Sequence, residues 1–342
     1  MLIKVYCIKQ RAGEMMVRKL TKNFVGLIIT LIVLMGLQSS VWANSKIIFI
    51  PHDNRPISFA QTVESAEGLG FEIVVPPEHL LGNRTDSGKV EALWQWLFQE
   101  IKTADSVVLS ADSLIYGSLV DSRKHELSLE TLLERTDKFA KLKQLQPNLR
   151  IYVFASIMRS PRSSFGGVEP SYYEQYGPSI FAATALEDKA ETVGLTKVEE
   201  KELLKFKKNV PEAAFADWLE RRSKNFTVNA KLVSLVNNND FVYLALGRDD
   251  NAPFSQTRKE SRLLKEQADA TPVSKFQCLA GIDELGMVLL TRAINDLSFN
   301  IPLVKIEYAN GVGKNTVPTY SDEEIDKSIW QHLLATGALP TK

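Results

Sequence analysis

The feature that most constrains the fold is the regular alternation of short apolar, β-branched runs with amphipathic helical patterns. The runs expected to form strands lie at residues 46–50, 71–75, 106–112, 151–158, 241–246 and 304–308, with a weaker one at 275–280. Helical patterns lie between the early runs, at residues 58–68, 90–101 and 128–145. This succession predicts parallel strands joined by right-handed crossovers. Because the runs are apolar on both faces, we expect a sheet that is buried on both sides.

Two arrangements satisfy this alternation. The first is a (β/α) barrel-like parallel sheet with a helical insertion at about residues 170–238, and the alternative is a doubly wound α/β sheet. The insertion is rich in Lys and Glu, so most of its charge is expected on solvated helix faces. The strand-like runs are fewer than the roughly eight strands of a closed barrel. The barrel would therefore be incomplete, and the chain is predicted to be truncated at its C-terminus.

The N-terminal segment, residues 1–43, has the layout of a secretory signal peptide. Basic residues precede an apolar run at 24–37, and Val41-Trp42-Ala43 follows as a small-x-small cleavage pattern. The run is shorter than the ~20 residues of a spanning helix, which favours a cleaved signal peptide over a membrane anchor. We expect residues 44–342 to form a single α/β domain, secreted or held in the cell envelope. Contact with a membrane would come only through an uncleaved N-terminal segment.

Charge and motifs exclude several classes of function. The chain carries 41 Lys and Arg against 41 Asp and Glu, so no basic nucleic-acid-binding surface is indicated. "NGVGKNT" at 310–316 has Asn315 where a phosphate loop needs Ser or Thr, and no dinucleotide fingerprint follows a strand, so no cofactor is predicted. The four histidines form none of the zinc-binding spacings, whereas a carboxylate-bound Mg²⁺ or Ca²⁺ stays open.

Polar and charged residues follow the ends of the predicted strands. The carboxyl ends of parallel strands form the ligand-binding face of α/β folds, so these side chains are expected to share one cleft. The predicted catalytic residues are Asp249, Asp250, Asp283 and Glu284. The predicted substrate-binding residues are Asp53, Arg55, Asp112, Arg159 and Asn251. Asp and Asn are also common in turns and at helix N-termini, so a capping role stays open for each of them.

Two adjacent acid pairs, Asp249-Asp250 and Asp283-Glu284, give the cleft its expected chemistry. Glycoside hydrolysis needs one acid to protonate the leaving oxygen and another to attack or to activate water. An adjacent pair also suits substrate-assisted hydrolysis of N-acetyl sugars, in which one acid orients the acetamido group. A carbohydrate is therefore the expected substrate.

Several ordered motifs resemble one bacterial family. They include "PHDNRP", "SADSLIYGSLVDSR", "SIMRSP", "GRDDNAPFSQTRKE" and "GIDELGMVLLTRA". From about residue 46 to 335 the chain resembles the family defined by a domain of unknown function numbered 4127, DUF4127. The first motif is usually "PLDDRP" in that family, and this chain has His52 and Asn54 there, so residue 54 is not predicted to be a catalytic acid. The resemblance assigns no catalytic residue.

Three functions follow as hypotheses. The first is an exported glycoside hydrolase-like enzyme that uses paired carboxylates at strand ends. The alternatives are a non-catalytic exported protein that binds a glycan or an envelope component, and a hydrolase that uses a carboxylate-bound metal.

Overall fold

The structure is a computed structural model that describes residues 3–8, 45–163, 167–249, 252–268, 271–308, 313–319 and 321–341. The strands are β1 (Ile3–Ile8), β2 (Lys46–Ile50), β3 (Glu72–Val74), β4 (Ser106–Ser110), β5 (Arg150–Ile157), β6 (Tyr243–Arg248), β7 (Phe276–Ala280), β8 (Leu303–Tyr308) and β9 (Leu339–Thr341). The helices are α2 (Ala60–Ala66), α3 (Val90–Glu100), α4 (Ala111–Ile115), α5 (Asp121–Lys124), α6 (Leu129–Leu145), α7 (Tyr173–Thr192), α8 (Lys197–Lys208), α9 (Glu212–Asn237), α10 (Gln256–Gln267), α11 (Leu285–Leu297) and α12 (Ile325–Ala335). Two short 3₁₀ turns, η2 (Glu78–Leu80) and η3 (Ile101–Thr103), flank α3.

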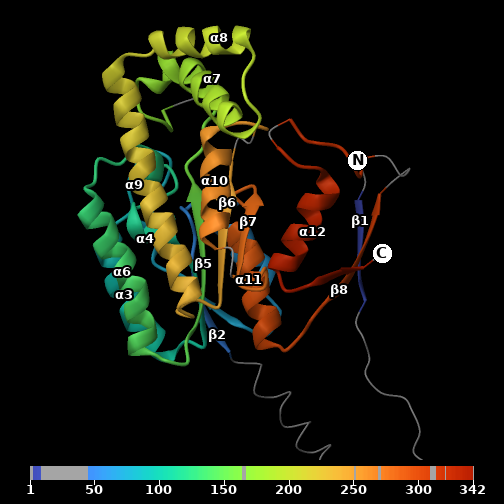
Figure 1. The fold of residues 1–342 in the computed structure, drawn as a ribbon. Helices are drawn as coiled ribbons and strands as arrows, with labels where there is room; N and C mark the ends of the chain where they lie inside the picture. The colour runs from blue at the N-terminus through green and yellow to red at the C-terminus, as the bar shows by residue number, and fades with distance from the viewer. Residues whose placement is uncertain are drawn as a thin grey trace, which may run out of the picture.

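The centre of the molecule is a six-stranded parallel sheet in the order β3-β2-β4-β5-β6-β7, with helices on both sides (Figure 1). This arrangement confirms the predicted α/β class. The order places the first strand of the sheet between the second and the third, as in doubly wound folds of the flavodoxin type. Within the described ranges no pairing joins β7 to β3, so no closed barrel is found there.

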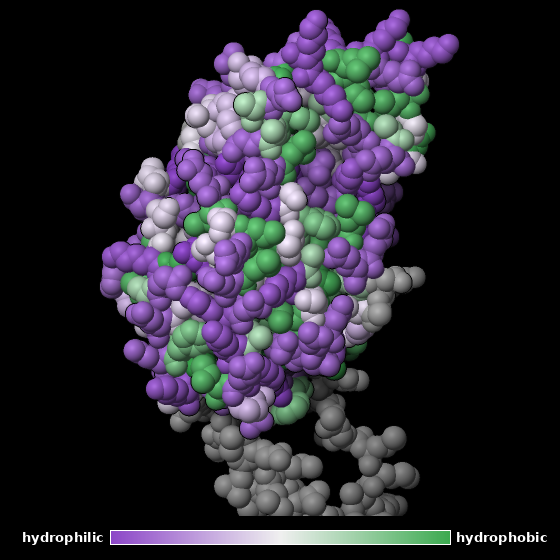
Figure 2. Space-filling model, turned by 60° about the vertical axis from the view of Figure 1, so that its left-hand side comes forward, coloured by the Kyte–Doolittle hydropathy of each residue, from purple (hydrophilic) through white to green (hydrophobic). Residues whose placement is uncertain are grey.

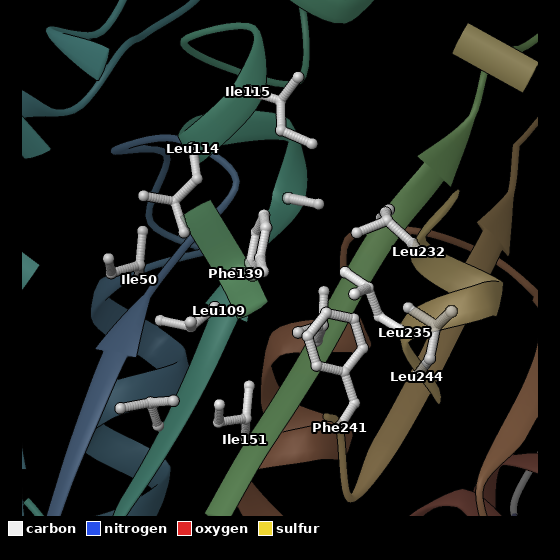
Figure 3. Close-up of a cluster of buried hydrophobic side chains, with 14 of the residues drawn as sticks. Ile50, Leu109, Leu114, Ile115, Phe139, Ile151, Leu232, Leu235, Phe241 and Leu244 are labelled. Carbon is white, nitrogen blue, oxygen red and sulfur yellow. The ribbon is translucent and has the colours of Figure 1, made fainter. Parts of the chain in front are cut away.

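Both faces of the sheet are buried, as the apolar runs predict. Successive residues of a strand point to opposite faces, so Val107 and Leu109 of β4 join one hydrophobic cluster and Val108 joins the other. On the first face, the strands pack against α3, α6, α9 and α10. Figure 3 shows this cluster, in which Leu109 and Leu244 lie near Phe139 of α6 and Leu232 of α9. The second face is covered by α2, α11 and the end of α12.

The order in which successive strands are added to the sheet reverses at β2, because β3 lies on one side of β2 and β4 on the other. Helix α2, between β2 and β3, contributes Ala66 to the second face, whereas α3, between β3 and β4, contributes Leu93 and Trp94 to the first. Right-handed crossovers on opposite faces carry the chain to opposite sides of β2. In open α/β sheets the expected ligand-binding crevice lies at such a switch point, which here is beyond the carboxyl ends of β2 and β4.

Strand β4 is shorter than the predicted run at 106–112. It ends at Ser110, whose side chain accepts a hydrogen bond from the backbone N–H of Ser113 and thereby starts α4. A side-chain acceptor at this position stabilises a helix start. Asp112 consequently lies in the first turn of a helix, although the sequence predicted it at the end of a strand.

The strand predicted at 304–308 is present but does not belong to the parallel sheet. It forms β8, which pairs antiparallel with β1 and parallel with β9 in a separate three-stranded sheet. Strand β1 falls inside the segment predicted to be a signal peptide. Residues 9–44, which hold the apolar run and the cleavage pattern of that prediction, lie outside the described residues. Within the described ranges, no helix combines the length and apolar character needed to cross a bilayer.

The predicted helical insertion consists of α7, α8 and α9. Helix α8 has no buried residue and begins with a capping box, in which Thr196 and Glu199 bond each other's backbone N–H groups. Its charge is thus on solvated surface, as predicted. In Figure 2 hydrophilic side chains dominate the visible face, including its top, where α7 and α8 lie in Figure 1, and smaller apolar patches are scattered between them.

A tight backbone contact holds the loops at the carboxyl edge of the sheet together. A methyl group on Gly88 would lie 2.3 Å from the carbonyl oxygen of Gly117 and 2.9 Å from the backbone nitrogen of Gly82. The carbonyl of Gly82 in turn accepts the backbone N–H of Asn54, 3.0 Å away in the loop after β2. Gly88 is therefore required for the loops that surround the crevice.

We expect Gly88→Ala to lower the free energy of unfolding by about 1–3 kcal/mol, because backbone atoms must move to admit the methyl group. Urea denaturation measures the change. Gly68→Ala is the comparison for backbone strain without a contact, since that methyl group would meet no atom within 4 Å and its whole cost comes from the positive φ of 77°. A Gly88→Ala chain as stable as the wild type would contradict the proposed tight contact.

Candidate functional site

The candidate site lies along the carboxyl edge of the parallel sheet. The chain leaves β2, β4, β5, β6 and β7 at this edge because all of them run in the same direction. The described candidates from the sequence lie in the segments that follow these strands. Asp250 and Asn251 lie outside the described residues.

One set of contacts joins the loops after β2 and β7 through Arg55. Its Nε donates to both carboxylate oxygens of Asp53, at 3.0 and 2.9 Å, and its Nη2 donates to Oδ1 of Asp283 at 2.9 Å. Burial alone would lower the pKa of Arg55, but the two carboxylates outweigh it and raise the pKa above its ordinary value. Arg55 therefore fixes Asp283, which is half-exposed, beside the buried Asp53.

A second set lies beneath the crevice and joins β2, β4 and β5. Asp112 accepts the backbone N–H of Ser156 at 2.9 Å and its hydroxyl at 2.7 Å. His52 Nδ1 lies 3.0 Å from Asp112 Oδ2 and 3.0 Å from the hydroxyl of Ser110. Because a carboxylate accepts, Nδ1 is assigned as the donor to Asp112, and Nε2 is buried with no hydrogen-bond partner among the described residues. Asp112 is only 1% exposed, so its visible role is to bind these strands together.

A third set forms the most heavily charged part of the edge, and we call it the arginine–carboxylate cluster: Arg123, Arg159, Glu169 and Asp249. Arg159 donates from Nε to Glu169 Oε1 at 2.6 Å, and its Nη1 lies 3.5 Å from Asp249 Oδ2. Arg123 Nη2 lies 3.6 Å from Asp249 Oδ2, and Nη1 lies 3.9 Å from Glu169 Oε1. Asp249 is the exposed member, with a side-chain exposure of 37%, whereas Glu169 is buried.

Burial and the neighbouring charges shift the pKa of Arg123 within this cluster. The pKa of Arg123 is lowered first by burial and then by the neighbouring charge of Arg159, although Asp249 and Glu169 oppose the shift. Two guanidinium groups that would repel one another are kept together by the two carboxylates between them. The cluster thus presents one carboxylate, Asp249, to solvent from a rigid charged base.

The second predicted acid pair is divided between two partners. Asp283 contacts Arg55, whereas Glu284 accepts a hydrogen bond from His332 Nε2 of α12 at 3.0 Å. Burial alone would lower the pKa of His332, but the hydrogen bonds to Glu284 and to the carbonyl of Ser328 outweigh it and hold the pKa above its ordinary value. The two neighbouring acids therefore point to different parts of the molecule and do not form a joint site.

Three residues at the edge were not predicted from the sequence. His52 directly precedes Asp53 at the end of β2, so its position was a usable signal. Arg123 belongs to the polar segment beyond β4. Glu169 follows β5 by a long loop and carries no positional signal, because only the tertiary structure brings it to Arg159.

The described residues contain no group of three or more His, Cys, Asp or Glu side chains arranged to hold a metal ion. The polar groups that do come together are carboxylates and guanidinium groups in ion pairs. They suit recognition of hydroxyl-rich or charged ligands and the stabilisation of developing charge.

Fold and site together define an open, doubly wound α/β protein with a charged site beyond the carboxyl ends of its strands. The chain belongs to the family described as protein of unknown function (DUF4127), whose family model matches residues 47–342. The predicted family resemblance is thereby confirmed. No curated protein and no solved structure matches the chain.

Proposed function

We propose that this protein is an exported hydrolase that cleaves a glycosidic bond at the carboxyl edge of its sheet. The observation that supports the proposal best is the position of Asp249. It follows β6 directly, is partly exposed, and contacts two arginines that are themselves anchored by the buried Glu169. A carboxylate held in this way has the rigid orientation that a reacting group needs.

The proposed division of labour assigns different roles to the adjacent acids. Asp249, between Arg123 and Arg159, stabilises the positive charge that develops at the anomeric carbon or directs the attacking water. Asp250 donates the proton to the leaving glycosidic oxygen. The bond between the anomeric carbon and that oxygen breaks, water supplies the hydroxyl group of the new reducing end, and the remaining proton of the water restores the acid form of Asp250.

The test is the release of reducing ends by the purified full-length chain from a panel of bacterial and plant polysaccharides and N-acetyl-sugar glycosides. We expect Asp249→Asn and Asp250→Asn each to reduce turnover by about 10²–10⁴-fold, the usual contribution of a positioned acid or base. Asp137→Asn is the matched control, because Asp137 is an exposed acid of α6 that pairs with Lys231. Wild-type turnover by a folded Asp249→Asn chain would refute the assignment.

A second candidate is a glycan-binding protein without catalysis. It is favoured by the ion pairs of Asp53, Asp283 and Asp249, each of which contacts an arginine. A carboxylate paired with an arginine can still accept hydrogen bonds from sugar hydroxyls, but the positive charge beside it favours its ionised form, so it is a poorer proton donor. Saturable binding of a glycan without any release of reducing ends would support this candidate.

A further inference from the structure

Two cavities lie near the carboxyl edge of the sheet and share one residue, Glu126, and the larger of them also reaches the arginine–carboxylate cluster. The larger, of about 690 Å³, is bounded by the loop at 167–172 and the start of α9, and Glu169 of the cluster forms part of its wall. The smaller, of about 500 Å³, lies between the start of α3 and the segment after α5. Glu126 lines both cavities.

We propose that these cavities are consecutive subsites for the sugar units of an extended glycan, whose scissile bond lies at the cluster. This inference rests on the proposed function and names its substrate class: a polymer bound along several units. A small ligand would need only one recess of this size, whereas Glu126 joins the two cavities and Glu169 of the larger one is linked to Asp249 through Arg159.

The larger cavity has the chemistry of a sugar subsite. Tyr172 lines it and is half-buried, and its hydroxyl donates to Asp217 Oδ2 at 2.5 Å. Arg221 binds the same carboxylate with two nitrogens, at 2.7 and 3.0 Å. The ring of Tyr172 is therefore held in one orientation. Its apolar face can stack on the C–H face of a sugar, and Asp217 and Arg221 lie beside it for the hydroxyls.

The remaining wall of this cavity supports the same interpretation. Pro170, Pro211, Ala213 and Ala214 give it small or rigid apolar surfaces, and Lys124 and Ser171 add polar groups. A mainly apolar lining with a few fixed polar groups is typical of small-molecule sites. Arg221 also donates to the carbonyl of His125, which lines the smaller cavity, so one side chain supports both recesses.

The smaller cavity is also lined by two rings, although Tyr116 exposes only 8% of its surface. Tyr116 and His125 both line it, with ring centroids 5.0 Å apart and planes inclined by 31°. Asp121, Glu126 and Arg135 supply polar groups around these rings. A sugar unit that leaves the larger cavity past Glu126 would meet this second surface.

The test measures binding by isothermal titration calorimetry with the full-length chain. The probes are oligomers of N-acetylglucosamine, glucose and galacturonate, each with two, four and six units. For one of these series we expect affinity to rise at least tenfold from two to six units, and we expect Tyr172→Ala to remove about tenfold of that gain. Tyr172→Phe keeps the ring and should keep most of the gain.

The matched control is Tyr176→Ala, because Tyr176 is half-buried and packs against the same apolar cluster as Tyr172 but does not line the cavity. Equal affinity for short and long oligomers, binding that Tyr172→Ala leaves unchanged, or no binding of any series at millimolar concentration would overturn the proposal. Length-dependent binding without hydrolysis would retain the subsites and reject the proposed hydrolase. Hydrolysis that depends neither on oligomer length nor on Tyr172 would retain the proposed hydrolase and reject the subsites.

Discussion

Glu260→Ala is expected to lower the free energy of unfolding by about 3–5 kcal/mol, the largest change predicted for any single side chain of this protein. Arg222 binds Glu260 with two nitrogens, at 2.7 and 2.8 Å, and Arg222 is only 1% exposed. Removing the carboxylate leaves a buried guanidinium charge without its partner. Water cannot reach it without opening the contact between α9 and α10.

The remaining contacts of Arg222 do not replace this partner. Its Nη1 donates to the carbonyl of Arg159 at 3.0 Å, its Nη2 donates to the hydroxyl of Thr257 at 3.5 Å, and its guanidinium lies 4.8 Å from the ring centroid of Trp218. None of these contacts neutralises a full charge. Because Arg222 holds the backbone of Arg159, the loss is also expected to loosen the arginine–carboxylate cluster.

Urea denaturation at neutral pH measures this effect, with Glu220→Ala as the control. Glu220 pairs with Lys224 one turn along α9 and is 68% exposed, so its removal should change stability by less than about 0.5 kcal/mol. The double variant Arg222→Met/Glu260→Met removes both buried charges and should be more stable than the sum of the single changes predicts. Additive losses would show that the two side chains do not act as a pair.

The second large effect is a dependence of stability on acid pH that comes from His125. The pKa of His125 is lowered to about 4, mainly by burial and also by the charges of Arg221 and Lys224, although the hydrogen bond with Asn225 opposes the shift. In the unfolded chain the pKa is about 6.5. Below that pH, His125 binds a proton in the unfolded chain but stays unprotonated in the folded chain until the pH falls to about 4. Stability is therefore complete above about pH 6.5 and decreases as the pH falls toward 4, by up to about 3 kcal/mol.

His125→Gln tests this prediction, since a glutamine amide does not titrate and can donate a hydrogen bond to Asn225. Between about pH 7 and pH 5 the wild type should lose about 2 kcal/mol more than the variant, measured as the difference in urea unfolding free energy. His332 has a raised pKa and contributes the opposite trend, with stability that is lost as the pH rises. It is present in both chains, so its contribution cancels in the difference. Parallel pH profiles for the two chains would contradict the low pKa.

Part of the candidate site could be predicted from the sequence. The prediction used the rule that polar residues at the ends of parallel strands share one face. It selected Asp53, Arg55 and Asp283, which the structure joins through Arg55. It also selected Asp249 and Arg159, which are close enough to interact. It could not tell that Glu284 bonds to His332, or that Asp112 is buried beneath the crevice, because those outcomes depend on which helix packs over each loop.

Local pattern by itself determined the six strands of the parallel sheet and β8, the helices between the early strands, and the burial of both sheet faces, but it did not indicate β1 or β9. Apolar periodicity and helix capping act over a few residues, so they can be read directly along the chain. The order of the strands was decided only by the tertiary structure. Strand–helix alternation allows a barrel-like or a doubly wound sheet, and the choice depends on which face α2 and α3 cover. The same reason explains β8: its pattern predicts a strand, but pairing with β1 and β9, which are distant in sequence, placed it outside the parallel sheet.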